Sequence, residues 1–355
     1  MKRIDRIAET LRRVGGELTA AEVAKLVGTT RANASHDLNR LADLGMVEKL
    51  PGRPVRFRWR GEPAGTAATA DGRDGAWTRD VGIFDRITGA RGSLAKQVEQ
   101  ARAAILYPPR GLHTLLLGST GVGKTLFAEL MYQFALESGR LPPDAPFVAF
   151  NCADYAANPQ LLMGQLFGVA RGAFSGADRD RPGLVEKADG GILFLDEVHR
   201  LPPEGQEMLF YLIDRGEYRR LGEAERVRRS SVLLIAATTE PPESALLSTF
   251  YRRIPMVIHL PDLRDRPVEE RRELIHRFVL EEQERIGVRV VLSPDALELL
   301  LRYECPGNIG QLRTDIQLAC AHAYLNYLSG KSRVVWIAPD ALPEHVRRGA
   351  GPGVS

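Results

Sequence analysis

Residues 118–125 read GSTGVGKT, which places glycines, a lysine and a hydroxyl residue at the spacing G-x-x-x-x-G-K-[ST]. Glycines let backbone N–H groups turn inward around phosphate oxygens, and a following helix N-terminus adds a favourable dipole. The apolar run TLLL precedes the motif and a helical pattern follows it, which is the context that the motif requires. We therefore predict a phosphate loop in which Lys124 reaches the β- and γ-phosphates of ATP and Thr125 holds Mg²⁺. The residues predicted to bind the nucleotide here are Gly118, Ser119, Thr120, Gly121, Val122, Gly123, Lys124 and Thr125.

A second chemical motif is the apolar run GILFLDE, which ends in two adjacent carboxylates. Asp196 is predicted to hold Mg²⁺ through water, and Glu197 to orient or deprotonate the attacking water. Neighbouring carboxylates repel each other, so placing two together is costly. This cost favours the metal-binding and water-activating roles over the alternative, in which the two residues only cap a helix N-terminus. His199 completes DEVH, which resembles the DExH box of helicases. Those enzymes need a second nucleotide-binding lobe, and the mostly helical remainder offers none, so we interpret His199 as an ordinary polar residue.

The elements that must position these motifs follow from the apolar periodicity. From about residue 80, apolar runs alternate with helical patterns, which predicts a parallel α/β sheet. From about residue 265 the pattern is purely helical and predicts a small helical lid. The predicted domains are a winged helix-turn-helix at 1–60, a flexible linker at 61–79, an α/β nucleotide-binding domain at 80–263, the lid at 264–346 and a Gly-rich tail at 347–355.

The N-terminal module carries the basic charge of the chain. Residues 1–60 contain 13 Lys and Arg against 7 Asp and Glu, a net charge of +6 in a chain whose total is +3. Such an asymmetry favours double-stranded DNA as a partner; the alternative is a solvated face on a protein-binding winged helix. The residues predicted to contact DNA are Arg31, Asn33, Ser35, His36 and Arg40 on the third helix, and Arg53, Arg56 and Arg58 on the wing.

Composition indicates a cytoplasmic protein. The start is charged without an apolar signal core, and no apolar run approaches the ~20 residues that span a bilayer. The 3 scattered cysteines argue against a disulfide framework and against a zinc site.

The segment that begins QLFGVARGAFSGADRD, contains GILFLDE and ends EYRRLGE resembles the AAA+ domain of bacterial sigma-54-dependent transcription activators. Those proteins carry a GAFTGA loop, which reads GAFSGA here, and the resemblance covers about residues 80–345. The stretch AAILYPPRGLHTLLLGSTGVGKT, with the DNA-binding module first, is most similar to the levanase-operon regulator branch. The resemblance implies a hexameric AAA+ ring that binds an upstream activating site. The ring would hydrolyse ATP with Mg²⁺ to remodel sigma-54 RNA polymerase.

The resemblance also implies roles for single residues. Asn151 matches a switch asparagine paired with the catalytic Glu197, and Arg252 or Arg253 falls where an arginine finger acts in trans. The residues that it implies for sigma-54 contact are Gly172, Ala173, Phe174, Ser175, Gly176 and Ala177.

The chain departs from the family pattern at two sensor positions. Thr239 stands where the broader family has a sensor asparagine, and Gly310 where it has a sensor arginine; Arg313, one helical turn on, is the candidate substitute. Two other functions stay open on the residues alone. One is a AAA+ helicase or replication initiator acting directly on DNA, and the other is a nucleotide-binding repressor without turnover.

Overall fold

The computed structural model describes residues 7, 10–11, 17–43, 47–50, 55–59, 82–174, 177–223, 225–330 and 333–349. The chain divides into two compact units, Met1–Trp77 and Thr78–Ser355, each with its own core. They are described separately below.

The first unit packs helices α2 and α3 on a small antiparallel sheet whose strand order is β1-β3-β2. Helix α2 begins at a capping box, in which the Thr19 hydroxyl accepts from the Glu22 amide and the Glu22 carboxylate accepts from the Thr19 amide. Phe57 is buried against both helices, while its neighbours Arg56 and Arg58 are exposed. The elements are β1 (Glu17–Thr19), α2 (Ala20–Val27), α3 (Arg31–Asp43), β2 (Val47–Leu50) and β3 (Arg56–Trp59).

The second unit is built on a five-stranded parallel sheet of order β12-β4-β11-β8-β5. Its central strands are almost entirely buried and rich in Leu, Ile and Ala, as expected for a sheet covered on both faces. The strands are β4 (Thr114–Leu117), β5 (Phe147–Asn151), β8 (Ile192–Asp196), β11 (Leu233–Thr238) and β12 (Met256–His259).

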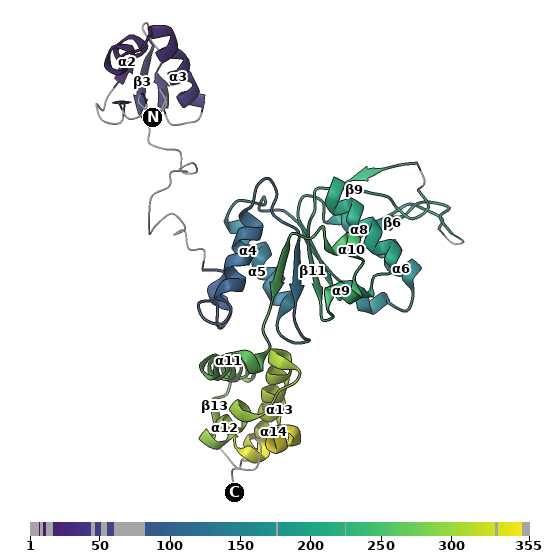
Figure 1. The fold of residues 1–355 in the computed structure, drawn as a ribbon. Coiled ribbons are helices and arrows are strands. Elements are labelled where there is room, and N and C mark those ends of the chain that lie inside the picture. Colours follow the sequence, from purple (N-terminus) through teal and green to yellow (C-terminus); the bar gives the residue numbers. More distant parts are fainter. Residues whose placement is uncertain are drawn as a thin grey trace. The chain divides into compact units, whose positions relative to one another are not determined.

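Helices cover the two faces of this sheet over separate hydrophobic clusters (Figure 1). One face is covered by α4 (Ala95–Leu106) and α5 (Lys124–Glu137). The other is covered by α6 (Pro159–Phe167), α7 (Leu184–Lys187), α8 (Pro203–Arg215), α9 (Pro242–Ala245) and α10 (Ser248–Tyr251). The described residues thus confirm the predicted α/β class.

Two short antiparallel pairs extend from the same end of the α/β part, where Figure 1 labels β6 and β9. The first joins β6 (Gly168–Val169) to β7 (Arg181–Pro182), and the second joins β9 (Glu217–Tyr218) to β10 (Arg228–Arg229).

The lid has its own core, in which α11 and α13 pack together. Its helices are α11 (Val268–Ile286), α12 (Pro294–Arg302), α13 (Asn308–Leu328) and α14 (Glu344–Gly349). The prediction of a purely helical lid is wrong in one respect, because β13 (Val290–Leu292) and β14 (Val335–Ile337) form a parallel pair. Strands of three residues are too short to show a periodicity. Among the described residues, no helix combines the length and apolar character needed to cross a membrane.

Candidate active site

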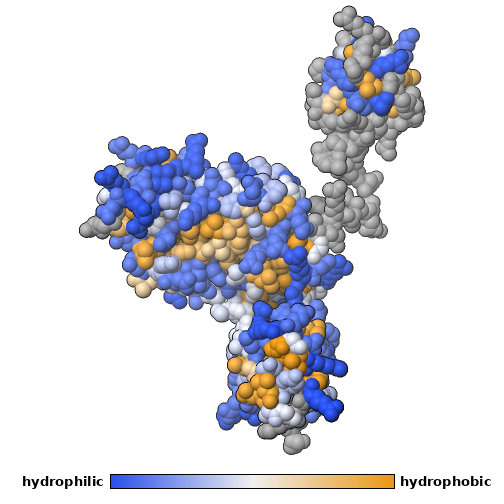
Figure 2. All heavy atoms as spheres, turned by 180° about the vertical axis from the view of Figure 1, so that it is seen from behind, coloured by the Kyte–Doolittle hydropathy of each residue, from blue (hydrophilic) through white to orange (hydrophobic). Residues whose placement is uncertain are grey.

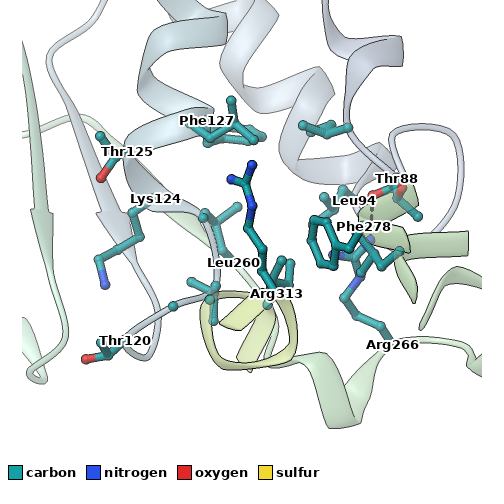
Figure 3. Close-up of a pocket in the computed structure, with 18 of the residues that line it drawn as sticks. Thr88, Leu94, Thr120, Lys124, Thr125, Phe127, Leu260, Arg266, Phe278 and Arg313 are labelled. Atoms are coloured by element: carbon teal, nitrogen blue, oxygen red, sulfur yellow. Dashed lines mark hydrogen bonds between the residues drawn. The ribbon is translucent and has the colours of Figure 1, made fainter. Parts of the chain in front are cut away.

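A cleft of about 430 Å³ lies between the α/β part and the lid. The phosphate loop and the β8 carboxylates line one side, and residues of α11 and α13 line the other. Figure 3 shows Arg313 reaching into this space between the side of Lys124 and Thr125 and the side of Phe278. The cleft thus brings together residues of the α/β part and residues of the lid that are far apart in the chain.

The Lys124 side chain is 6% exposed and lies at the first position of α5. Its Nζ donates to the carbonyl oxygens of Gly118 at 2.8 Å and Ser119 at 3.2 Å. Burial lowers the pKa of Lys124, and the negative charges of Asp196 and Glu197 act in the opposite direction. The ammonium is therefore held inside the loop, where an incoming phosphate could replace these carbonyl contacts.

Two oxygen-bearing side chains meet at the mouth of the loop. Thr125 Oγ1 lies 3.5 Å from Asp196 Oδ2, although the two residues are 71 positions apart in the chain. Hydroxyl and carboxylate oxygens are donors that Mg²⁺ accepts, usually together with water and phosphate. The donor set therefore fits the cation that the sequence predicts.

Glu197 occupies a left-handed backbone conformation, with φ of 49°, at the end of β8. Non-glycine residues in this conformation are uncommon and cluster at functional sites. Its Oε2 accepts a hydrogen bond from the Thr239 hydroxyl at 3.1 Å. His199 Nδ1 lies 3.4 Å from the same oxygen and 2.9 Å from Thr238 Oγ1. His199, predicted to be an ordinary polar residue, lies in the short helix after β8 and contacts the Glu197 carboxylate.

Asn151 lies beside Asp196 in the β5–β8 register, so it reaches the same edge of the sheet. Its side-chain oxygen accepts from the Ala153 amide at 3.0 Å and caps the following turn. The pairing with Glu197 that the resemblance implies is not made here. The Glu197 carboxylate instead accepts a hydrogen bond from the Thr239 hydroxyl.

The lid approaches the phosphate loop through the start of α13. The Gly310 amide donates to the Gly121 carbonyl at 3.0 Å, so position 310 lies directly against the loop. Arg313 lines the cleft, pairs with Glu281 at 2.8 Å and stacks 5.8 Å from the Phe278 ring centroid.

The two arginines after α10 differ in their surroundings. Arg253 pairs with Asp214 at 3.2 Å and lies over the Phe210 ring at 5.5 Å. Arg252 is exposed, and its side chain has no partner among the residues that the structure describes. Only Arg252 is thus available to another molecule without first breaking an intrachain contact.

The loop between β6 and β7 is closed at its base by backbone contacts. The Gly172 amide donates to the Ala177 carbonyl at 2.8 Å, and the Ala177 amide donates to the Phe174 carbonyl at 3.0 Å. Gly172 has a φ of 81°, a conformation that favours glycine. The Phe174 side chain is 41% exposed. Ser175 and Gly176 lie outside the described residues.

This loop is tied to the neighbouring hairpin by a buried arginine. Arg220 lies just after β9, in the β9–β10 hairpin. It pairs with Glu186 at 2.7 Å and with Asp180 at 3.3 Å. Asp180 in turn accepts from the Arg171 amide at 2.8 Å. The base of the loop and the β9–β10 hairpin therefore form one connected structure.

In the first unit, the described part of the predicted DNA surface is polar and accessible. Arg31, Asn33, Arg56 and Arg58 are exposed, and Ser35 is half-buried. The side chains of His36 and Arg40, and the whole of Arg53, lie outside the described residues.

Residues 87–259 match the family described as the Sigma-54 interaction domain. The chain is similar to the transcriptional regulatory protein LevR of Bacillus subtilis, with 44% identity over 98% of this chain and 40% of LevR. It is also similar to the transcriptional regulatory protein DagR of Salmonella typhimurium, with 47% identity over 86% of this chain and 34% of DagR. The chain thus spans well under half the length of these two relatives.

Among solved structures, the fold is similar to that of NtrX from Brucella abortus in complex with ADP. The TM-score is 0.59 at 25% identity, with 76% of this chain and 57% of the NtrX chain covered. The parallel sheet, the phosphate loop and the helical lid agree with a AAA+ fold.

Proposed function

Because the chain belongs to the sigma-54-dependent transcription activators and is LevR-like, we propose that it is a DNA-binding ATPase that remodels sigma-54 RNA polymerase to open promoters. The observation that carries the proposal is the convergence of Lys124, Asp196 and Glu197 in one cleft beside the lid. The experiment is ATP-dependent melting of a promoter held by sigma-54 holoenzyme, read by the reactivity of unpaired thymines. Melting that proceeds equally without ATP would contradict the proposal.

In the proposed site, the phosphate loop holds the ATP phosphates and Lys124 exchanges its carbonyl contacts for phosphate oxygens. Thr125 and Asp196 would hold Mg²⁺, which would neutralise charge on the phosphates. Arg313 takes the place of the lid arginine, because Gly310 lies against Gly121 and has no side chain to offer. Arg313 would leave Glu281 to reach phosphate.

Glu197 is the general base in this proposal, since its carboxylate lies at the strand end beside Lys124. The Thr239 hydroxyl orients that carboxylate by its hydrogen bond at 3.1 Å. Asn151 and His199 also lie at this edge of the sheet, and Asn151 could reach the attacking water by leaving its cap.

Assembly into a ring, with six copies as the expected number, would place an arginine of one copy at the site of the next. Hydrophobic side chains exposed on the lid support assembly, as Leu318 is 53% and Leu325 is 63% exposed. Figure 2 shows hydrophobic residues at the surface of both the lid and the α/β part. Of the two candidates, we assign the finger to Arg252, because Arg253 is already engaged by Asp214.

We predict that Arg252→Ala lowers ATP turnover at least ~10-fold more than Arg253→Ala does, since only the former removes a group that meets charge developing on the γ-phosphate. The measurement is kcat at a protein concentration that saturates assembly, with Arg253→Ala as the matched control.

Mixing two inactive variants tests whether the finger acts in trans. Arg252→Ala and Glu197→Gln subunits should regain part of the activity when mixed, because some interfaces then combine an intact base with an intact finger. Equal losses for the two arginines, or no recovery on mixing, would count against the assignment.

The loop 170–180 is proposed to contact sigma-54 through Phe174. Its connection to the site runs from Glu197 along α8 to the β9–β10 hairpin, where Arg220 holds Asp180 at the loop base. A movement of Glu197 when the γ-phosphate is lost would thus displace α8, and α8 would move the loop through the β9–β10 hairpin.

The first unit is proposed to bind double-stranded DNA at an upstream activating site. The exposed Arg31, Arg56 and Arg58 support it, because arginines on a helix and an adjacent strand can neutralise phosphates.

We predict that residues 1–77 bind duplex DNA with an affinity that falls roughly 40-fold between 50 and 200 mM salt, as three phosphate contacts would give. Arg56→Ala should reduce the slope of log K against log salt by about one. Fluorescence anisotropy of labelled DNA measures both quantities, with Lys25→Ala on α2 as the control. Salt-insensitive binding, or none to any promoter fragment, would favour a protein-binding winged helix.

A further inference from the structure

The turn that precedes α13 lies directly on the phosphate loop. A Cβ at Gly121 would overlap the carbonyl oxygen of Gly307, so the two backbones approach as closely as glycine allows. The Gly310 amide also donates to the Gly121 carbonyl. Movement of this turn toward the loop would therefore displace the loop, and movement away from it would break the hydrogen bond to Gly121.

Asn308 joins three parts of the unit through one side chain. Its Nδ2 donates to the Thr120 carbonyl of the phosphate loop at 3.0 Å. Its Oδ1 accepts from the amide of Leu263 at 2.8 Å, at the turn that leads from the sheet into the lid. One partner can only accept and the other can only donate, so the pair of contacts defines the orientation of the amide. Asn308 itself is 3% exposed, and its contact with the Leu263 amide is buried.

A row of polar contacts within the lid ends at Asn308, which has a left-handed conformation with φ of 56°. The Cys305 thiol donates to the Asn308 carbonyl at 3.1 Å, and Tyr303 Oη lies 3.0 Å from that sulfur. The Tyr303 hydroxyl donates to Asp315 at 2.9 Å, and Asp315 contacts His345 of α14 at 2.9 Å. Burial raises the pKa of both the Tyr303 hydroxyl and the Cys305 thiol, so both keep the protons that they donate.

We propose that Asn308 is a positioning residue for the nucleotide site: its amide sets the place of the Thr120 carbonyl, and thus the shape of the phosphate loop, according to the orientation of the lid. The inference rests on the proposed nucleotide-binding function. It makes nucleotide affinity depend on a lid residue that lies behind the loop, and it connects α14 to the site through a row of polar contacts.

The test is Asn308→Asp in the full chain. Aspartate tolerates the left-handed conformation and keeps the acceptor for the Leu263 amide. It loses the donor to Thr120 and places a negative oxygen against that carbonyl. We expect the Kd of the folded variant for ADP to rise at least ~10-fold, with kcat at saturating ATP within threefold of wild type. Asn326→Asp, the same change at an exposed position of α13, should leave the Kd unchanged.

Asn308→Gly covers the case in which the aspartate variant does not fold, because glycine also accepts the positive φ and loses both contacts without adding charge. It should weaken ADP binding as well. Wild-type ADP affinity in a folded variant of either kind would overturn the inference, whereas a wild-type chain that binds no nucleotide would overturn the proposed function itself.

Discussion

Glu197→Gln should bind Mg-ATP with near wild-type affinity and hydrolyse it at least ~100-fold more slowly. The amide keeps the size of the side chain and can still accept from Thr239, so the site stays assembled. It cannot take a proton from water, and general-base catalysis contributes about 10²–10⁴-fold. Single-turnover hydrolysis and the Kd for ATP, measured separately, distinguish chemistry from binding.

The matched control for this experiment is Glu204→Gln, at an exposed glutamate in the first turn of α8. It makes the same chemical change on the same domain and should leave turnover unchanged. Near-normal turnover by the Glu197 variant would remove this residue from the catalytic role.

Phe174→Ala should fold, assemble and hydrolyse ATP at the wild-type rate, yet fail to bind or remodel sigma-54. Exposed aromatic side chains are typical anchors of protein interfaces, and truncation of such an anchor removes most of the binding energy. Because Phe174 is 41% exposed, its truncation removes less packing than truncation of a fully buried phenylalanine. The measurements are sigma-54 binding, promoter opening and the melting temperature of the same preparation. Ser175→Thr, which adds one methyl group, should be tolerated in all three.

Phe167→Ala supplies the contrast for this variant. Phe167 ends α6, seven residues before Phe174, and is fully buried. Its truncation should cost about 3–5 kcal/mol of folding free energy, as for other buried phenylalanines. If Phe174→Ala melts as low as Phe167→Ala, Phe174 is a packing residue; if the variant still opens promoters, Phe174 is not the sigma-54 contact.

The sequence by itself determined the features whose residues are neighbours in the chain. The phosphate loop around Lys124 is one example, because its glycines, lysine and hydroxyl all lie within eight positions between a strand and a helix. The capping box of Thr19 and Glu22 is another, since both partners lie within one helical turn. Local periodicity likewise predicted the alternation of strands and helices.

Only the tertiary structure decided which distant residues meet these motifs. Asn308 contacts Thr120 across 188 positions, and Thr239 contacts Glu197 across 42. The order of strands in the sheet and the approach of the lid create these contacts, and neither leaves a local pattern. The same holds for Arg252 and Arg253, which are equivalent in the sequence and differ only because α8 brings Asp214 to one of them. Packing between remote segments, and not the spacing of residue types, thus decides which side chains surround the phosphate loop and Glu197.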